Sequence, residues 1–446
     1  MSNKPSNYRW TVCGLLFFAT TVNYLDRQVL SLLAPQLTES FHWTNADYAN
    51  ITTIFQLVYA LSMLAAGRFI DRVGTKRGYL IAISVWSIGA MMHAFSEEMG
   101  AAALPLLGLV GLYAVPASVL GFMISRAVLG LGEAGNFPAA IKVTAEHFEP
   151  KERAFATGIF NSGANIGAIL APLTVPWMAE FWGWQTAFIL VGAVGFIWIF
   201  FWQIMYKPAV QSTAESTAVE SISESDQQVA DANTPSTGVL KSTAAWAFIA
   251  GKFFTDGVWW FFLFWLPKYL DAQYQMKGTE IITPLIVLYS LTMVGSIGGG
   301  WLPSLFIKKG YTTLRARTVS MGGIAILPLL VLLAQPLGGI SYWVPVLCIG
   351  FGAAAHQAWS ANLYTLVSDL FPKNKIARIV GIGGMAGGLG SILLTQIAGK
   401  VFDYYDAQNN ISLGYTYIFI YCAIAYIGAW FCIRMLLRQQ LKNAIN

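Results

Sequence analysis

Long apolar stretches alternate with short polar segments along almost the whole chain. The first six stretches cover residues 10–34, 47–67, 78–96, 116–145, 153–178 and 185–206. Six more cover residues 243–270, 281–306, 314–335, 341–367, 376–402 and 414–437. A bilayer-spanning helix needs about 20 apolar residues. The pattern therefore predicts an all-α membrane protein of 12 transmembrane helices in two six-helix pseudo-symmetric bundles.

The segment 208–241 separates the two sets of apolar stretches. It is rich in Ser, Thr, Ala, Gln and acidic residues and has almost no large apolar side chain. Such a segment cannot bury enough apolar surface to fold. We expect an N-terminal six-helix bundle over residues 1–207, a flexible cytoplasmic linker over 208–241, and a C-terminal six-helix bundle over 242–446.

Composition and charge placement support a membrane location and give its orientation. Only 11% of the 446 residues are charged and 56% are hydrophobic, whereas soluble domains carry about 25% charged residues. If the N-terminus is cytoplasmic, 21 of the 27 Lys and Arg residues fall in cytoplasmic segments and three fall in segments on the outer side of the membrane. Because basic loops stay in the cytoplasm, we expect both termini there, in a bacterial inner membrane. The remaining three basic residues lie inside spans: Arg27, Arg126 and Lys252.

Residues 97–116 do not fit a simple loop. The stretch is apolar and interrupted by Gly and Pro, yet the orientation requires it to lie outside. We expect an extended or re-entrant start to the fourth span.

The loop between the second and third spans carries a recognisable pattern, GRFIDRVGTKR, over residues 67–77. Glycine permits close helix approach and a tight turn, and the aspartate can accept charge-assisted hydrogen bonds from a neighbouring helix end or an arginine. The pattern resembles a signature of the major facilitator superfamily, which implies that family's fold and a role for the loop as a conformational latch. The latch residues are Gly67, Asp71, Arg72, Gly74, Lys76 and Arg77. The corresponding segment 299–317 keeps glycines and basic residues but lacks the aspartate, as expected of repeated halves.

Charged residues within the spans are costly, by about 2.5–3.5 kcal/mol or more each on insertion scales, and they mark function. In the first span, Tyr24 and Arg27 share a helix face. A guanidinium offers a bidentate fork to a carboxylate. We therefore expect Arg27 to anchor an anion. Tyr24, and Tyr59 from the second span, should donate hydrogen bonds to the same anion.

Acidic residues in the same region are candidates for proton exchange. Glu133 lies seven residues after Arg126 on one face of the fourth span, and Asp26 precedes Arg27. A carboxyl group in a low-dielectric cavity favours its protonated form. We expect Glu133 and Asp26 to exchange protons and Arg126 to pair with one of them. A structural ion-pair network is the alternative for all four charged residues.

The pattern NYxDR in the first span, with RxxxGxxEAxxxP in the fourth, resembles the anion:cation symporter family. This resemblance implies a carboxylate on Arg27 and coupling protons on Asp26 and Glu133. Residues 252–270, 356–372 and 381–390 resemble the hexuronate branch, whose substrates are galacturonate and glucuronate. Ala164 and Met385 depart from galactonate-type carriers, which have glutamine and asparagine in the corresponding spans.

Further polar residues within spans are candidates for sugar recognition. Asn161 and Asn165 share a face of the fifth span and either bind hydroxyls or hold helices together. Trp259 or Trp260 can stack on a sugar ring or face lipid, and Lys252 with Asp256 fits a local ion pair better than a ligand site. The tenth span has a polar cluster that we expect to line a cavity, with helix packing as the alternative: His356, Gln357, Trp359, Ser360 and Asn362.

These observations predict a secondary active transporter that imports a hexuronate anion by proton symport through alternating access. Another organic anion, sodium coupling, an exchange mode and a non-transporting nutrient sensor are the alternatives. There is no P-loop, metal-ligand cluster or nucleophile motif in the sequence. We expect no cofactor, no metal and no enzymatic activity. The expected partners are a small organic anion, protons and the lipid bilayer, without nucleic acid, and the protein is expected to be a monomer.

Overall fold

The computed structural model describes residues 7–108, 115–148, 150–208, 241–371 and 373–443, and every regular element within them is helical. The first half contains α1 (Tyr8–Phe41), α2 (Asn45–Val73), α3 (Thr75–Met92), η1 (His93–Phe95), α4 (Ser96–Gly108), α5 (Ala117–Glu133), α6 (Asn136–His147), α7 (Pro150–Trp182) and α8 (Trp184–Met205). The second half contains α11 (Thr243–Tyr274), η2 (Gly278–Ile281), α12 (Ile282–Lys308), α13 (Thr313–Ile324), η3 (Leu327–Leu333), α14 (Trp343–Leu370), α15 (Lys373–Asp406), α16 (Ile411–Leu436) and α17 (Arg438–Asn443).

The predicted helical membrane fold is confirmed. In the described part of the chain, ten helical segments are long and apolar enough to cross a membrane. α1 and α14, which have 34 and 28 residues, are not among the ten. They are also the helices that contain Arg27 and His356. The count of twelve spans, the cytoplasmic termini and the division at residues 207 and 242 remain predictions, and the predicted linker lies almost wholly outside the described residues.

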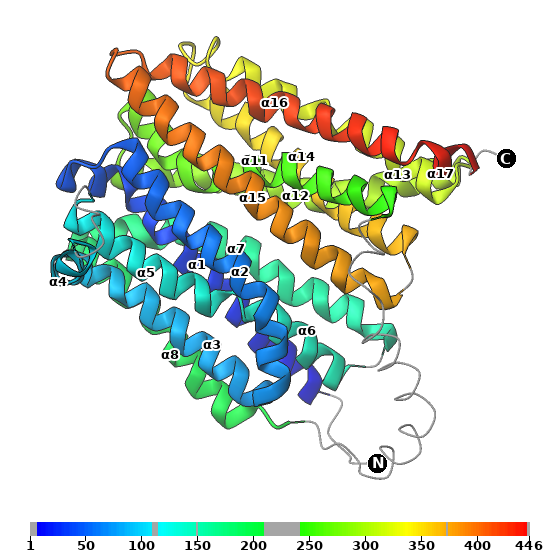
Figure 1. Cartoon of the computed structure of the whole chain (residues 1–446), viewed down its shortest axis with the longest axis horizontal. Coiled ribbons are helices and arrows are strands. Elements are labelled where there is room, and N and C mark those ends of the chain that lie inside the picture. Colours follow the sequence, from blue (N-terminus) through cyan, green and yellow to red (C-terminus); the bar gives the residue numbers. More distant parts are fainter. Residues whose placement is uncertain (1–6, 109–114, 149, 209–240, 372, 444–446) are drawn as a thin grey trace.

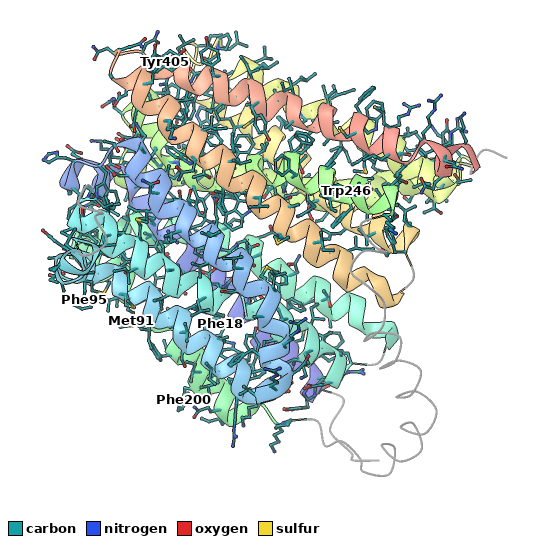
Figure 2. All side chains as sticks on the ribbon, viewed as in Figure 1. Phe18, Met91, Phe95, Phe200, Trp246 and Tyr405 are labelled. Carbon is teal, nitrogen blue, oxygen red and sulfur yellow. The ribbon has the colours of Figure 1, made fainter. Side chains whose placement is uncertain are left out.

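The outside of the bundle is apolar. Phe200, Ile204 and Ile297 are 60%, 62% and 70% exposed, and Phe200 and Phe95 lie at the edge of the bundle in Figure 2. A water-soluble protein rarely leaves so much contiguous apolar surface uncovered. The exposed side chains therefore fit contact with lipid tails.

The segment after η1 differs from the prediction. Residues 96–108 form the separate helix α4, which continues the direction of α3 and runs antiparallel to α5. Glycine makes this contact possible, because a Cβ at Gly100 would lie 1.7 Å from the Ala117 carbonyl oxygen and one at Gly121 would lie 1.6 Å from that of Ser96. The stretch thus prolongs the third span instead of beginning the fourth, and residues 109–114 lie outside the described part.

The fourth span is broken immediately after Glu133. α5 ends at that residue and α6 begins at Asn136. Pro138 explains the break, because proline has no backbone N–H to donate to the carbonyl four residues earlier. The break therefore lies directly after α5, the helix that contains the buried residues Arg126 and Glu133.

The helices of the first half lie together on one side of the molecule and those of the second half on the other (Figure 1). We call the end that holds α17 and the α2–α3 turn the inner end, and the end that holds α4 and the α15–α16 turn the outer end. The inner end is the expected cytoplasmic one. α2 and α15, and α1 and α11, meet across the boundary between the halves.

Candidate functional site

Arg27 and Glu133 form an ion pair deep in the protein. Arg27 donates to Glu133 Oε2 from Nε at 2.9 Å and from Nη2 at 2.6 Å. Their side chains are 4% and 0% exposed. α1 and α5 thus bring together two residues that are 106 positions apart. Both point into the protein and not toward the outer apolar surface.

Four aromatic rings surround the Arg27 guanidinium. Its Cζ atom lies 4.8 Å from the ring centroid of Tyr24, 5.3 Å from that of Phe55, 5.0 Å from that of Tyr59 and 5.2 Å from that of Trp260. Such contacts between a cation and an aromatic face are attractive, especially away from water. Three of the rings come from α1 and α2, while Trp260 comes from α11 in the second half. The guanidinium therefore lies where the two halves meet.

Two further charged residues lie beside this pair. Arg126 donates from Nη1 and Nη2 to the carbonyl oxygen of Arg27, both at 3.3 Å. Asp26 is 2% exposed, and neither of its carboxylate oxygens has a hydrogen-bond partner among the described residues. A buried charge without a partner is costly. Proton exchange on Asp26 remains a prediction.

The structure brings most of the first-half candidates together. Tyr24 and Tyr59 both contact Arg27, and Glu133 is its direct partner. In this conformation the predicted acidic partner of Arg126 is replaced by the carbonyl oxygen of Arg27. Hydrogen bonding of the two tyrosines to an anion remains a prediction. α7 packs closely on α1, because a Cβ at Gly167 would lie 2.9 Å from that of Tyr24. On the same helix Asn161 is exposed and Asn165 is half-buried. The two alternative roles of Asn161 and Asn165, in sugar binding or in helix packing, remain predictions.

The polar cluster of the tenth span has a different environment. His356 Nδ1 is 2.8 Å from the Tyr426 hydroxyl, and its ring stacks on Trp259 at 5.5 Å. Asn362 donates to the carbonyl oxygen of Gly299 at 2.7 Å, and thereby joins α14 to α12. These contacts lie inside the second half and not against Arg27. The rest of the cluster is on α14: Gln357 and Ser360 are half-buried and Trp359 is fully buried.

Phe55 is a contact of Arg27 that the sequence did not single out, and the sequence did not distinguish Trp260 from Trp259. Trp259 and Trp260 were equal candidates as adjacent tryptophans in one apolar helix. Only the rotation of α11 decides that Trp260 faces Arg27 while Trp259 faces His356. Phe55 carries no signal of its own in an apolar span.

The two halves are joined at the outer end by a carboxylate on a helix terminus. Asp403 of α15 accepts from the backbone N–H of Asn45 at 2.6 Å and of Ala46 at 2.8 Å. These are the first N–H groups of α2, which have no partner within the helix and carry its positive dipole end. Asp403 therefore caps a helix that belongs to the other half.

Other polar contacts reinforce the outer end. Lys268 donates to the Asn45 side chain at 2.9 Å, and Lys277 pairs with Glu39 at 2.6 Å. Slightly deeper, Tyr48 donates to the carbonyl oxygen of Phe264 at 2.6 Å. On the inner side of Arg27 the apolar side chain of Leu61 on α2 is 55% exposed. The halves are therefore closed against each other at the outer end.

The predicted latch loop adopts the expected turn. Gly74 has φ +86°, between α2 and α3, a conformation that glycine adopts without strain. Asp71 pairs with Lys142 of α6 at 2.7 Å, so its partner is a lysine rather than an arginine or a helix end. The close approach predicted at Gly67 is absent from this conformation, because a Cβ there would meet nothing within 4 Å.

The second half has an ion pair of the same kind with the charges exchanged. Arg317 at the start of α13 donates to Asp369 of α14 at 2.7 Å. The missing loop aspartate is thus replaced by an acid from the neighbouring span. A role of this segment as a second copy of the latch remains a prediction.

The fold and the buried charges define a helical multi-pass membrane protein with a charged centre between two halves. The model of the Major Facilitator Superfamily matches residues 16–395. The chain is 30% identical to the hexuronate transporter of Escherichia coli K12 over 410 residues, which covers 90% of this chain and 89% of that one. The chain therefore belongs to the major facilitator superfamily, a family of membrane transporters, as the loop signature predicts.

Other relatives and solved structures agree on the fold. The galacturonate transporter of Dickeya chrysanthemi is 29% identical, with 68% of this chain and 84% of the other covered, and the D-galactonate transporter of Escherichia coli O6:H1 is 27% identical, with 96% and 95% covered. The structure matches a bacterial homologue of the lysosomal transporter Spinster with a TM-score of 0.74 and 17% identity, covering 98% of each chain. It matches a D-xylose–proton symporter with a TM-score of 0.70 and 14% identity, covering 95% and 97%.

Proposed function

We propose that this protein imports a hexuronate anion together with protons, by alternating access across the bacterial inner membrane. The observation that carries the proposal is the Arg27–Glu133 pair, which is buried at the boundary between the halves and enclosed by rings from both. The relatives include transporters of hexuronate, galacturonate and galactonate. All three substrates are six-carbon sugar acids.

The proton and the anion bind to the two side chains that now pair with each other, the proton to Glu133 and the anion to Arg27. Glu133 now occupies the fork of Arg27 that a substrate carboxylate requires. A proton on Glu133 weakens this pair and releases the guanidinium for the anion, because two hydrogen bonds to a charged partner contribute about 1.5–3 kcal/mol each. Proton binding and anion binding then favour each other, which is the requirement for symport.

The four rings around Arg27 suit a sugar acid. A pyranose has C–H faces that pack against aromatic rings, and its carboxylate fits the guanidinium fork. Trp260 is the ring supplied by the second half, so a bound sugar contacts both halves at once. Closure around the substrate then follows from its contacts with both halves.

The conformation described here is closed outside and fits the inward-facing step of the cycle. Asp403, Lys268 and Lys277 hold the outer end, and these contacts must break before the anion enters from outside. In the outward-facing step the inner ends of the two halves approach each other instead.

The proposal is tested by uptake into proteoliposomes that contain the purified protein. With an inward proton gradient we expect accumulation of radiolabelled D-galacturonate above the external concentration, and a loss of accumulation when a protonophore collapses the gradient. Sodium gradients should have no effect. Accumulation that needs sodium, or preference for galactonate or galactarate over galacturonate and glucuronate, would contradict the coupling or the substrate respectively.

Replacing Asp403 with alanine should shift the protein toward the outward-open state. The substitution removes two hydrogen bonds to a charged acceptor, worth about 1.5–3 kcal/mol each, so the outward-open population should rise at least about tenfold. Spin labels at Glu98 on α4 and Gln408 after α15 report the separation of the outer ends by double electron–electron resonance.

The exposed neighbour Asp406 provides a matched control on α15. Asp406→Ala should leave the label distances unchanged. Equal distance distributions in Asp403→Ala and in the wild type would show that the cap on α2 does not hold the outer end closed.

A further inference from the structure

The second half contains a buried ion pair that the site above does not use. Lys252 Nζ lies 2.6 Å from Asp256 Oδ2, one turn away on α11. It also lies 3.1 Å from the Tyr364 hydroxyl and 4.7 Å from the centroid of that ring on α14. The side chains of Lys252 and Asp256 are only 7% and 13% exposed.

A buried ion pair is a weak source of stability for an apolar helix. Charges within a span are costly, and a buried ion pair is often no more stabilising than apolar residues of the same volume. The remainder of α11 between Gly257 and Pro267 is apolar and aromatic. A lysine and an aspartate at this depth therefore indicate a role in transport.

The position of the pair relates it to Arg27. Lys252, Asp256 and Trp260 follow one another at intervals of four residues, so they share one face of α11. Trp260 touches the Arg27 guanidinium. Eight residues of α-helix span about 12 Å, so Lys252 lies two turns closer to the inner end than the ring above Arg27. Tyr364, which contacts the ammonium group, is 41% exposed.

We propose that Lys252 is a second binding station for the substrate carboxylate, between Arg27 and the inner end, and that Asp256 is the counter-charge that keeps the anion from being retained there. This inference rests on the proposed function. An anion that leaves a guanidinium in an apolar protein needs a nearby cation to lower its barrier. Transit also requires each site to bind weakly enough to release.

The fold holds Asp256 in place beside the lysine. α15 packs against this carboxylate at Gly387, where a Cβ would lie 2.1 Å from Asp256 Oδ2. The absence of a side chain at Gly387 leaves room for the carboxylate between α11 and α15, where it pairs with Lys252. Tyr364 is the partner that an incoming carboxylate displaces, since its ring already reaches the protein surface.

Binding to the purified full-length protein tests the roles of the two charges. Asp256→Asn leaves Lys252 without its counter-charge, so D-galacturonate should bind about 10-fold more tightly, which corresponds to about 1.4 kcal/mol, and should dissociate more slowly. The double variant Lys252→Met/Asp256→Asn should return to wild-type affinity. D-galactose, which lacks the carboxylate, should show neither change. A merely structural pair predicts weaker or unchanged binding in Asp256→Asn.

Counterflow provides a second measurement if Asp256→Asn does not fold, as judged by its melting temperature. The Lys252→Met variant should bind galacturonate at Arg27 with unchanged affinity. It should exchange galacturonate about 10-fold more slowly, which corresponds to about 1.4 kcal/mol. Lys442→Met, at an exposed position on α17, is the matched control. Three results would each contradict the proposal that Lys252 is a second binding site. They are unchanged binding in folded Asp256→Asn, tighter binding that persists in the double variant, and a wild-type rate of exchange in Lys252→Met.

The same measurements separate this inference from the proposed substrate. If the wild type binds galactonate or galactarate and not galacturonate, the hexuronate assignment fails and the comparison of variants is made with the acid that binds. If Arg27→Ala abolishes binding but Asp256→Asn does not change it, the first site stands and the second station fails. If none of these acids binds to the folded wild type, both proposals fail.

Discussion

Replacing Arg27 with alanine should abolish galacturonate uptake, and replacing it with lysine should lower uptake by about 100-fold. A lysine keeps the charge but cannot offer the two parallel N–H groups that a carboxylate accepts. The loss of one hydrogen bond to a charged group costs about 1.5–3 kcal/mol, which corresponds to about 10- to 100-fold in affinity. The four rings that fit a planar guanidinium add to the loss.

Initial rates of uptake into proteoliposomes measure the effect of the Arg27 variants. Arg438→Lys is the matched control, because Arg438 is exposed at the start of α17, away from the boundary between the halves. The melting temperature of each purified variant verifies folding. A folded Arg27→Lys protein that transports within threefold of the wild type would show that the bidentate fork is not the anchor.

Replacing Glu133 with glutamine should abolish accumulation against a gradient while leaving exchange measurable. Glutamine is neutral at every pH and close in shape to the protonated acid, so the variant remains in the state in which Arg27 is free for the anion. Galacturonate should then equilibrate across the membrane, and its accumulation ratio should fall to about 1, since the variant lacks the proton step at Glu133 that biases the cycle.

The Glu133 experiment pairs proton-driven uptake with counterflow in the same vesicles. Counterflow needs binding and alternating access but no net proton movement, so it should persist in Glu133→Gln. Glu98→Gln, at an exposed position on α4, should behave as the wild type in both assays. Concentrative uptake that survives in Glu133→Gln would remove Glu133 from proton coupling and leave Asp26 as the remaining candidate.

The sequence by itself determined the membrane class, most of the helical spans and the charged residues that lie within them. Hydropathy is a local property, and in a lipid environment each helix satisfies its own backbone hydrogen bonds. The spans can therefore be read from the chain without knowledge of its fold. The same reasoning singles out Arg27, Asp26 and Glu133, because a charge in an apolar helix is conspicuous in any fold. The turn at Gly74 is equally local.

Tertiary structure alone decided which groups meet. Helix rotation directs Trp260 toward Arg27 and Trp259 toward His356, and no feature of two adjacent tryptophans encodes that choice. Asp403, which caps α2, is 358 positions from Asn45 and 357 positions from Ala46 in the sequence. The glycine contacts that make α4 an extension of α3 likewise require both backbones to be in place. Such pairings depend on the packing of one helix against another, which is a non-local property that no single segment of the sequence contains.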